Sequence, residues 1–306
     1  MRALVIGANG FAGAYLMKEL AANGYDVVGA DVFASEGDNI VKVDMLSEDD
    51  SFALISNTMP DVIFNLAGQA APSIAWEKIN LTMHLNVDIS VNIANAVAKF
   101  CPACKILLIG SANQYDGFSA PGGLISEETR LNNSNPYDVS KNTQEALMRI
   151  MAERYGLNIM MTRSFNHIGA GQKTGFVITD YASRIVALEN GKIDTFSFGN
   201  LDSWRDFSDV RDVVRAYRLI AERGKAGEIY NVGSGKSFYV RDLVGHLVEL
   251  SDKAKASVTL PPRKAPEELT HIRADISKLT RDTGFVPECD INETLKEVLT
   301  YYRKLG

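Results

Sequence analysis

Residues 2–13 read RALVIGANGFAG, and this stretch decides the fold. The apolar run over residues 2–7 is typical of a strand buried on both faces. A helical pattern then continues to about residue 23, where Gly24 is a natural stop. A strand, a glycine turn and a helix in this order let the backbone approach a dinucleotide, with its pyrophosphate at the helix N-terminus. A plain tight turn is the alternative. The cofactor candidates in the turn are Gly7, Asn9, Gly10, Phe11 and Gly13.

The second expected strand, over residues 26–30, ends at Asp31. An acidic residue at about this distance from the glycines typically holds the ribose hydroxyls of the adenosine. A carboxylate at this place repels a 2′-phosphate, and no arginine stands beside it. The sequence therefore favours NAD(H), while NADP(H) stays possible.

Apolar segments and helical patterns keep alternating after this first unit. Further strands are expected at 40–43, 61–66, 105–109 and 158–162, with a long helix at about 79–100. The alternation predicts an α/β fold, a Rossmann-type doubly wound parallel sheet that forms a dinucleotide-binding domain over residues 1–165. Ligands of such sheets lie across the carboxyl ends of the strands. Those ends add the cofactor candidates Asp44, Met45, Leu66, Ala67 and Gly68.

The rhythm loosens after about residue 164. Helices are expected at 176–189, after 212, at 240–250 and at 294–305, with strands near Phe196 and at 228–232. We expect a smaller C-terminal α/β domain, mainly residues 166–306, that binds the substrate. Its chain returns to the first domain at about 207–234.

Composition limits the possible partners. The 306 residues are 46% hydrophobic and 23% charged, with a net charge of −6. No basic cluster and no stretch of transmembrane length occur, so nucleic acid and membrane are unexpected partners. Three cysteines, an odd number, favour a reducing cytoplasm without structural disulfides. Cys101 and Cys104 have redox-motif spacing, but they follow a helical run, and no further Cys or His pair completes a metal site. We interpret them as a helix-end turn.

Residues 135–141 read NPYDVSK and carry a candidate acid. Asn135 is a plausible N-cap and Pro136 suits the first helical position, so Tyr137 and Lys141 share one helix face. A nearby cation can lower the pKa of a tyrosine from about 10. Tyr137 is therefore a candidate general acid or base, unless the pair shares a face by chance.

Ser111 follows the strand at 105–109 and should converge with this pair opposite a nicotinamide. Hydride transfer to a carbonyl leaves negative charge on its oxygen, which needs a proton donor and a second hydrogen-bond donor. Tyr137 would supply the proton, Ser111 the polarising bond, and Lys141 would lower the tyrosine pKa and reach the cofactor ribose. Alternatively, Ser111 only caps its own backbone.

These residues resemble a known family. Gly7-x-x-Gly10-x-x-Gly13, Ser111 and Tyr137-x-x-x-Lys141 look like an extended short-chain dehydrogenase/reductase, the group of nucleotide-sugar epimerases, dehydratases and reductases. Residues 163–172, 175–177 and 199–212 are similar to the GDP-4-dehydro-6-deoxy-D-mannose reductases. The resemblance implies a GDP-linked sugar as substrate.

The resemblance also implies binding roles. Asn166 would lie at the sugar and Arg205 at the diphosphate, because a guanidinium forks onto phosphate oxygens. An ion pair between Arg205 and Asp206 is the alternative. His167 is expected to be structural, and Tyr115 either lines the pocket or packs. Further substrate-binding candidates are Gln69, Asn113, Val177 and Asn200.

Asn113 helps to choose the reaction. Related 4,6-dehydratases carry a carboxylate at the matching position because removing the C5 proton needs a base, and GDP-fucose synthases use a cysteine there. An amide can do neither, whereas reduction of a 4-ketone needs only Ser111, Tyr137 and Lys141. A reductase is therefore favoured. The alternatives are an NAD-dependent nucleotide-sugar 4-epimerase, a 4,6-dehydratase and a non-catalytic dinucleotide-binding sensor.

Two further expectations rest on the resemblance. Reductases of this type usually have an Arg-Pro pair at the nucleotide, where this chain has Ala265-Pro266 with Arg263 and Lys264 nearby. Related enzymes pair through helices that correspond to residues 85–100 and 138–155. A homodimer is therefore expected.

Overall fold

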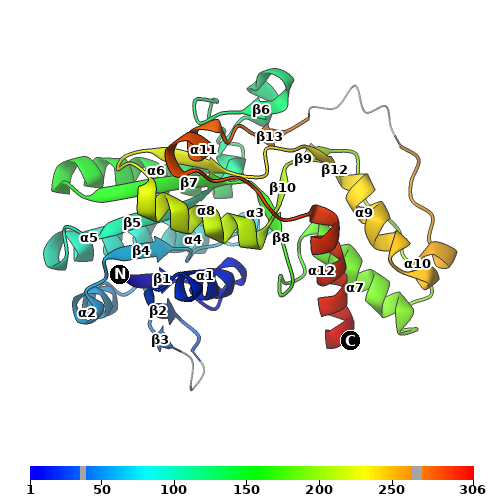
Figure 1. Ribbon diagram of the computed structural model, residues 1–306, viewed down its shortest axis with the longest axis horizontal. Helices are drawn as coiled ribbons and strands as arrows, with labels where there is room; N and C mark the ends of the chain where they lie inside the picture. Colours follow the sequence, from blue (N-terminus) through cyan, green and yellow to red (C-terminus); the bar gives the residue numbers. More distant parts are fainter. Residues whose placement is uncertain (35–38, 264–270) are drawn as a thin grey trace.

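A computed structural model gives the fold of residues 1–34, 39–263 and 271–306. Seven strands, all paired in parallel, form one sheet in the order β11-β7-β5-β4-β1-β2-β3 (Figure 1). This confirms the expected doubly wound sheet. The strands span β1 Arg2–Ile6, β2 Asp26–Asp31, β3 Ile40–Lys42, β4 Val62–Asn65, β5 Lys105–Ser111, β7 Asn158–Ser164 and β11 Ile229–Val232.

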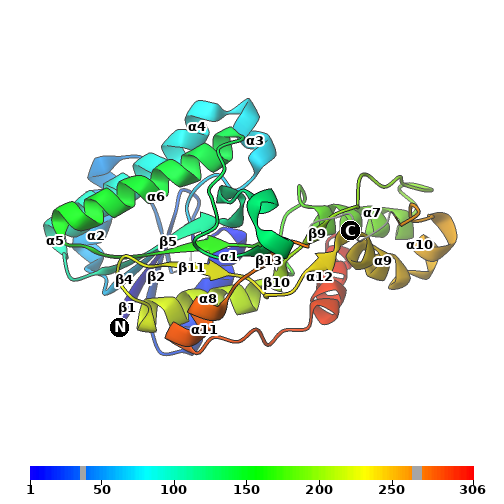
Figure 2. The ribbon, with the colours of Figure 1, turned by 90° about the horizontal axis from the view of Figure 1, so that it is seen from above.

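Helices cover both faces of the sheet (Figure 2). Side chains alternate along the strands, so Val5 points to one face and Leu4 to the other. One face packs against α1 Phe11–Ala22, α8 Val210–Arg223 and α11 Ser277–Thr283. The other packs against α2 Glu48–Thr58, α5 Ile89–Phe100 and α6 Pro136–Tyr155.

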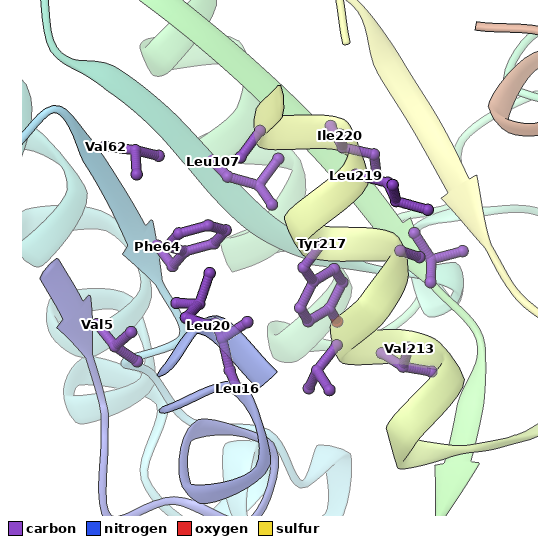
Figure 3. Packing of buried hydrophobic residues seen from close by; sticks show 14 of the residues in the cluster. Val5, Leu16, Leu20, Val62, Phe64, Leu107, Val213, Tyr217, Leu219 and Ile220 are labelled. Carbon is purple, nitrogen blue, oxygen red and sulfur yellow. The ribbon is translucent and has the colours of Figure 1, made fainter. Parts of the chain in front are cut away.

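Tyr217 on α8 lies at the centre of the first of these cores (Figure 3). It is 1% exposed, packs beside Leu16 and Phe64, and its hydroxyl lies 2.7 Å from Ser164 Oγ. A buried phenol needs such a partner, because an unpaired one costs about 1–3 kcal/mol. The contact fixes α8 against the end of β7, although the two are 53 residues apart in the chain.

A second group of elements, mostly helices, lies beside the sheet, at the right of Figure 1. Its core joins apolar side chains of α7 Val177–Glu189, α9 Val240–Glu249 and α12 Ile291–Leu305, with α10 Asp252–Ser257 beside them. Three two-stranded pairs connect it to the sheet: β10 Phe207–Asp209 with β8 Asn166–Ile168, β12 Phe238–Tyr239 with β9 Trp204–Arg205, and β13 Arg273–Ala274 with β6 Leu124–Ile125.

The strand expected near Phe196 is wrong. Residues 191–203 form no strand, and Phe196 and Phe198 instead pack against Tyr181 of α7, with ring centroids 6.1 and 5.2 Å away. Alternate residues of an extended segment point to the same side, so the apolar pattern of a strand appears here without a partner strand.

The helix expected at 79–100 is interrupted. It consists of α4 Ile79–Met83, a π-helical turn over His84–Asp88, and α5, and it follows α3 Pro72–Glu77. A π-turn inside an α-helix often marks a functional site. Here it carries Asn86, which is fully buried and bonds to segments outside the helix.

Candidate functional site

The glycine turn joins β1 to α1 at the carboxyl edge of the sheet. Gly7 has φ +85°, and a Cβ there would lie 2.9 Å from the backbone nitrogen of Ala67. A Cβ on Gly13 would lie 2.1 Å from the carbonyl oxygen of Gly7. Gly10 caps α1 without a side-chain bond, and no acidic residue stands in the first turn. The first amides of α1 are therefore open to an anion such as a pyrophosphate.

Phe11 and Asn9 link the glycine turn to residues outside it. Phe11 contacts His167, and Asn9 contacts Asp31. Phe11 stacks on His167 with ring centroids 6.0 Å apart, and His167 Nδ1 donates to the carbonyl of Phe165 at 3.1 Å. Burial lowers the pKa of His167, so the ring is neutral and serves packing.

Asp31 is the residue that the sequence predicts to hold the adenosine ribose. Its carboxylate accepts the backbone N–H groups of Asn9 at 3.0 Å and Phe33 at 3.1 Å. The charge is thereby fixed at the end of β2, next to the glycine turn. This is the place from which a carboxylate can accept ribose hydroxyls.

The ends of β3 and β4 supply the next cofactor candidates. The Asp44 carboxylate accepts the backbone N–H of Leu46 in its own turn. Met45 is buried, and its carbonyl accepts the side-chain amide of Asn92 at 3.0 Å. Leu66, Ala67 and Gly68 follow β4.

Gly68 requires the absence of a side chain. It has φ +147°, and a Cβ would lie 2.4 Å from Asn86 Oδ1 and 3.8 Å from Lys141 Nζ. Asn86 Oδ1 also accepts the backbone N–H of Gln69 at 2.8 Å, and its amide donates to Ser140 Oγ at 2.8 Å. Asn86 therefore ties the strand end to α6, a role that the sequence analysis missed.

Tyr137 begins α6 as expected. Asn135 accepts the amide of Asp138 at 3.0 Å as N-cap, and Pro136 takes the first helical position. Burial raises the pKa of Tyr137, a hydrogen bond with Ser111 lowers it, and the charge of Asp138 raises it. The net direction is upward, so the phenol keeps its proton at neutral pH and can donate it.

Ser111 has the capping contact, one of the two roles that the sequence left open, while its bond to a substrate ketone stays a prediction. Its Oγ accepts the amide of Asn113 at 3.2 Å, which is the capping role, and it is also the hydrogen-bond partner of Tyr137. The end of β5 thus presents a hydroxyl to the phenol of α6.

Lys141 is buried one turn after Tyr137. Its ammonium donates to the carbonyl of Ile109 at 3.0 Å and to Gln144 Oε1 at 3.1 Å. Burial lowers its pKa to about 8. Within the described ranges, Lys141 is not among the groups that shift the pKa of Tyr137, because its charge is directed at β5 and Gln144. The expected lowering by Lys141 is therefore wrong for this arrangement.

A buried polar network holds the serine end of the site. Gln114 Oε1 accepts the backbone N–H of Ser111 at 2.9 Å, and its amide donates to Glu145 Oε2 at 3.0 Å. Glu145 in turn pairs with Arg163 at 2.6 Å, and the guanidinium lies over the ring of Tyr115. Tyr115 is 4% exposed, so it packs. Breaking such a buried pair costs about 3–5 kcal/mol.

The substrate candidates come from both parts of the structure, with Gln69 and Asn113 at strand ends of the main sheet. Asn166 in β8 and Asn200 are exposed, Val177 starts α7 half-buried, and Asn113 is exposed beside Ser111. Gln69 accepts the amide of Ala71 at 2.8 Å. Ala265 and Pro266 lie outside the described residues, as does Lys264. The substrate-binding roles stay predictions.

Arg205 in β9 has no acidic partner among the residues that the structure describes. Its NH1 donates to the carbonyl of Trp204 at 2.7 Å, and burial alone lowers its pKa. The alternative of a pair with Asp206 is wrong, because Asp206 accepts from Ser234, Gly235 and Ala274. A half-buried, unneutralised guanidinium is a fitting site for an anionic group.

Comparisons with known proteins agree with this arrangement. The family model "NAD dependent epimerase/dehydratase family" matches residues 3–233. GDP-6-deoxy-D-mannose reductase of Pseudomonas aeruginosa is 32% identical over 256 residues, which cover 83% of this chain and 84% of the relative. UDP-glucose 4-epimerase of Mycolicibacterium smegmatis is 26% identical over 317 residues, 99% of each chain.

Solved structures give the same picture. RMD of P. aeruginosa complexed with NADPH superposes with a TM-score of 0.84 at 30% identity, covering 100% of this chain and 99% of that one. UDP-glucose 4-epimerase of Thermotoga maritima with UDP-glucose gives a TM-score of 0.86 at 26% identity, with the same coverage.

The glycine turn, the carboxylate of Asp31 and the group of Ser111, Tyr137 and Lys141 fit a nicotinamide dinucleotide. Together with the match over residues 3–233, they confirm the resemblance to the extended short-chain dehydrogenase/reductases. The chain belongs to the NAD dependent epimerase/dehydratase family, the NAD(P)-dependent enzymes that act on nucleotide sugars.

Proposed function

We propose that this enzyme reduces the C4 ketone of a GDP-linked 4-keto-6-deoxy-hexose, with Tyr137 as the proton donor. The observation that carries the proposal is the buried Tyr137 phenol, which keeps its proton and is hydrogen-bonded to Ser111. A reductase needs a protonated acid at the start of the reaction, because negative charge develops on the ketone oxygen.

Each of the three residues has one task in this reaction. A bound nicotinamide supplies the hydride. Ser111 donates a hydrogen bond to the ketone oxygen and orients it, and Tyr137 transfers its proton to the same oxygen. Lys141 donates to the carbonyl of Ile109 at the end of β5 and would reach the ribose of the cofactor.

The diphosphate of the substrate is assigned to Arg205. Its guanidinium is half-buried and lacks an acidic partner within residues 1–34, 39–263 and 271–306, so a phosphate would displace no carboxylate of these ranges. Gln69, Asn113, Asn166, Val177 and Asn200 would contact the sugar and the nucleotide. The GDP base is supported by the P. aeruginosa reductase, whose identity to this chain is 32%.

Asn113 argues against dehydration. It lies next to Ser111 and matches the position where the related 4,6-dehydratases carry a carboxylate, and a neutral amide cannot accept the C5 proton. A 4-epimerase is the second candidate, because it requires the same three residues, and the epimerase of T. maritima has the higher TM-score of the two, 0.86. A non-catalytic sensor would not need the acid.

NAD(H) is the proposed cofactor, since the Asp31 carboxylate is fixed beside the glycine turn and would repel a 2′-phosphate. NADP(H) is the alternative, supported by the NADPH in the RMD complex. We also propose a homodimer formed through the segments 85–100 and 138–155. Val139 and Ile150 support it, because both are apolar and exposed on α6. A cytoplasmic location stays a prediction, and no helix in the described ranges is long and apolar enough to span a bilayer.

The test follows nicotinamide absorbance with purified enzyme and either NADH or NADPH. GDP-4-keto-6-deoxymannose is the substrate, and the UDP- and dTDP-linked keto sugars are controls. Oxidation with the GDP sugar alone supports the proposal. If NADH and NADPH are oxidised with none of these sugars and the purified enzyme contains bound NAD, the 4-epimerase is favoured over the reductase.

A further inference from the structure

Cys101 and Cys104 lie in a tight turn at the edge of the sheet opposite the site. α5 ends at Phe100, and Cys101 is its C-cap, with its amide donating to the carbonyl of Val97 at 3.0 Å. The amide of Cys104 then donates to the carbonyl of Cys101 at 2.8 Å, immediately before β5. A turn closed by this bond keeps its first and fourth Cα atoms within about 7 Å. Disulfides span Cα distances of about 4.4–6.8 Å, so the turn brings the two Cα atoms to about the separation that a disulfide needs.

The two thiols differ in access. Cys104 is 2% exposed and packs into the core between the sheet and α5. Cys101 is partly exposed, and both line an open surface pocket together with Met59 and Asp61. A small molecule can therefore reach the first sulfur but not the second.

The Cys104 thiol donates to the carbonyl of Lys105 at 3.3 Å. The neighbouring Cys104 thiol lowers the pKa of Cys101, while Cys101 and burial raise the pKa of Cys104. The accessible thiol is thus the better nucleophile, and the protected one keeps its proton until it is attacked or activated.

We propose that Cys101 and Cys104 form a redox-active dithiol, which closes to an intramolecular disulfide by exchange with a small disulfide such as oxidised glutathione. The Cys101 thiolate attacks one glutathione sulfur, the S–S bond breaks, and one glutathione thiolate leaves. Cys104 loses its proton to solvent, attacks the sulfur of Cys101, and releases the second glutathione thiolate. Two protein thiols are oxidised, and one external disulfide is reduced to two thiols after protonation.

The cysteine turn lies at the end of β5 opposite to Ser111, so the dithiol proposal does not depend on the reductase proposal. The dithiol precedes Lys105, and Ser111 ends the same strand, six residues after Lys105. At about 3.3 Å per residue, roughly 20 Å separate the two ends. Cys101 also stands at the carboxyl end of α5, which disfavours negative charge, so we expect exchange over about minutes to hours.

The experiment incubates the purified full-length protein anaerobically with defined ratios of oxidised to reduced glutathione. An alkylating agent stops the exchange, and mass spectrometry maps the products. We expect a fraction with Cys101 linked to Cys104, rising with the proportion of oxidised glutathione. The protein should still bind NADH in this form. Wild type that stays fully reduced in the most oxidising mixture would overturn the proposal.

Variants identify the attacking sulfur. Cys104→Ser should accumulate a glutathione adduct on Cys101, whereas Cys101→Ser should leave Cys104 unmodified. Cys289 is the internal control, because it is also partly exposed, while burial raises its pKa to about 11. An adduct that forms as fast on Cys289 as on Cys101 would contradict the proposal. Since disulfide mapping uses the wild-type chain, a poorly folded variant does not decide the outcome.

Discussion

Arg205 and Asp206 are neighbours in the chain but do not pair with each other. Asp206 is fully buried, and its two oxygens hold Ser234, Gly235 and the amide of Ala274. Arg205 has only the carbonyl of Trp204 as a bonded partner within the described part of the chain. The Asp206 carboxylate therefore stabilises the fold, and we expect the Arg205 guanidinium to bind a ligand.

Replacing Arg205 should weaken substrate binding. A hydrogen bond to a charged group contributes about 1.5–3 kcal/mol, so we expect Arg205→Ala to raise the KM for the nucleotide sugar roughly ten- to a hundredfold, with a smaller change in kcat. Steady-state kinetics measure this. Arg154→Ala is the control, since Arg154 is exposed near the far end of α6. An unchanged KM in Arg205→Ala would show that Arg205 does not bind the diphosphate.

Removing the phenol hydroxyl of Tyr137 should abolish turnover without removing the cofactor. General acid catalysis contributes about 10²–10⁴-fold, so Tyr137→Phe should lower kcat by that factor while NADH binding, followed by fluorescence, stays within a few-fold. Tyr115→Phe is the matched control. It loses the bond to Asn231 at 2.7 Å and should cost about 1–3 kcal/mol of stability, with kcat nearly unchanged. If Tyr137→Phe turns over within a few-fold of wild type, the acid is misassigned.

Lys141 should make the stability of the cofactor-free protein depend on pH. Burial lowers its pKa in the folded state from 10.5 to about 8, so between these values the unfolded chain binds more protons. Stability should therefore rise with pH in this window, by on the order of 1–2 kcal/mol from pH 7.5 to 9.5. Below about pH 8 the folded protein carries the full cost of a buried ammonium.

Urea unfolding of wild type and Lys141→Met at these two pH values measures this contribution. The variant should lack the gain, and Lys173→Met, which alters an exposed lysine, should keep it. Equal gains in wild type and Lys141→Met would show that another group causes the pH dependence.

Asp31 should set the choice between the two cofactors. Wild type should have the lower KM for NADH, because a 2′-phosphate would meet a fixed carboxylate of like charge. Asp31→Asn keeps the size and removes the charge, so the ratio of KM values should move toward NADPH by roughly tenfold or more. Asp26→Asn, at the start of the same strand, is the control. Wild type that prefers NADPH would contradict the assignment of Asp31.

The sequence predicted the sheet well because its strands are buried on both faces and read as short apolar runs between turns. It did not reveal α2, whose first turn consists of Glu48, Asp49 and Asp50 and whose apolar face is narrow. Nor did it show the π-turn that carries Asn86, whose bonds to Gln69 and Ser140 form only in the folded chain.

The candidate site was predictable to the extent that it depends on local spacing. Tyr137 and Lys141 follow from one helical turn, and Ser111 from the end of a strand. Their partners do not, since Gln114 and Glu145 are 31 residues apart and Asp206 meets Ala274 across 68 residues. For the same reason the sequence could not decide whether Asp206 would neutralise Arg205.

The most direct test of the reductase proposal is isotope transfer. The enzyme is supplied with NADH deuterated at the transferred position and with GDP-4-keto-6-deoxymannose, and the sugar product is analysed by NMR. We expect one deuterium at C4 of a GDP-6-deoxy-hexose, with one NAD formed for each product. No labelled deoxy sugar, together with 4-epimerisation of an unlabelled UDP-sugar by enzyme that retains its NAD, would contradict the proposal.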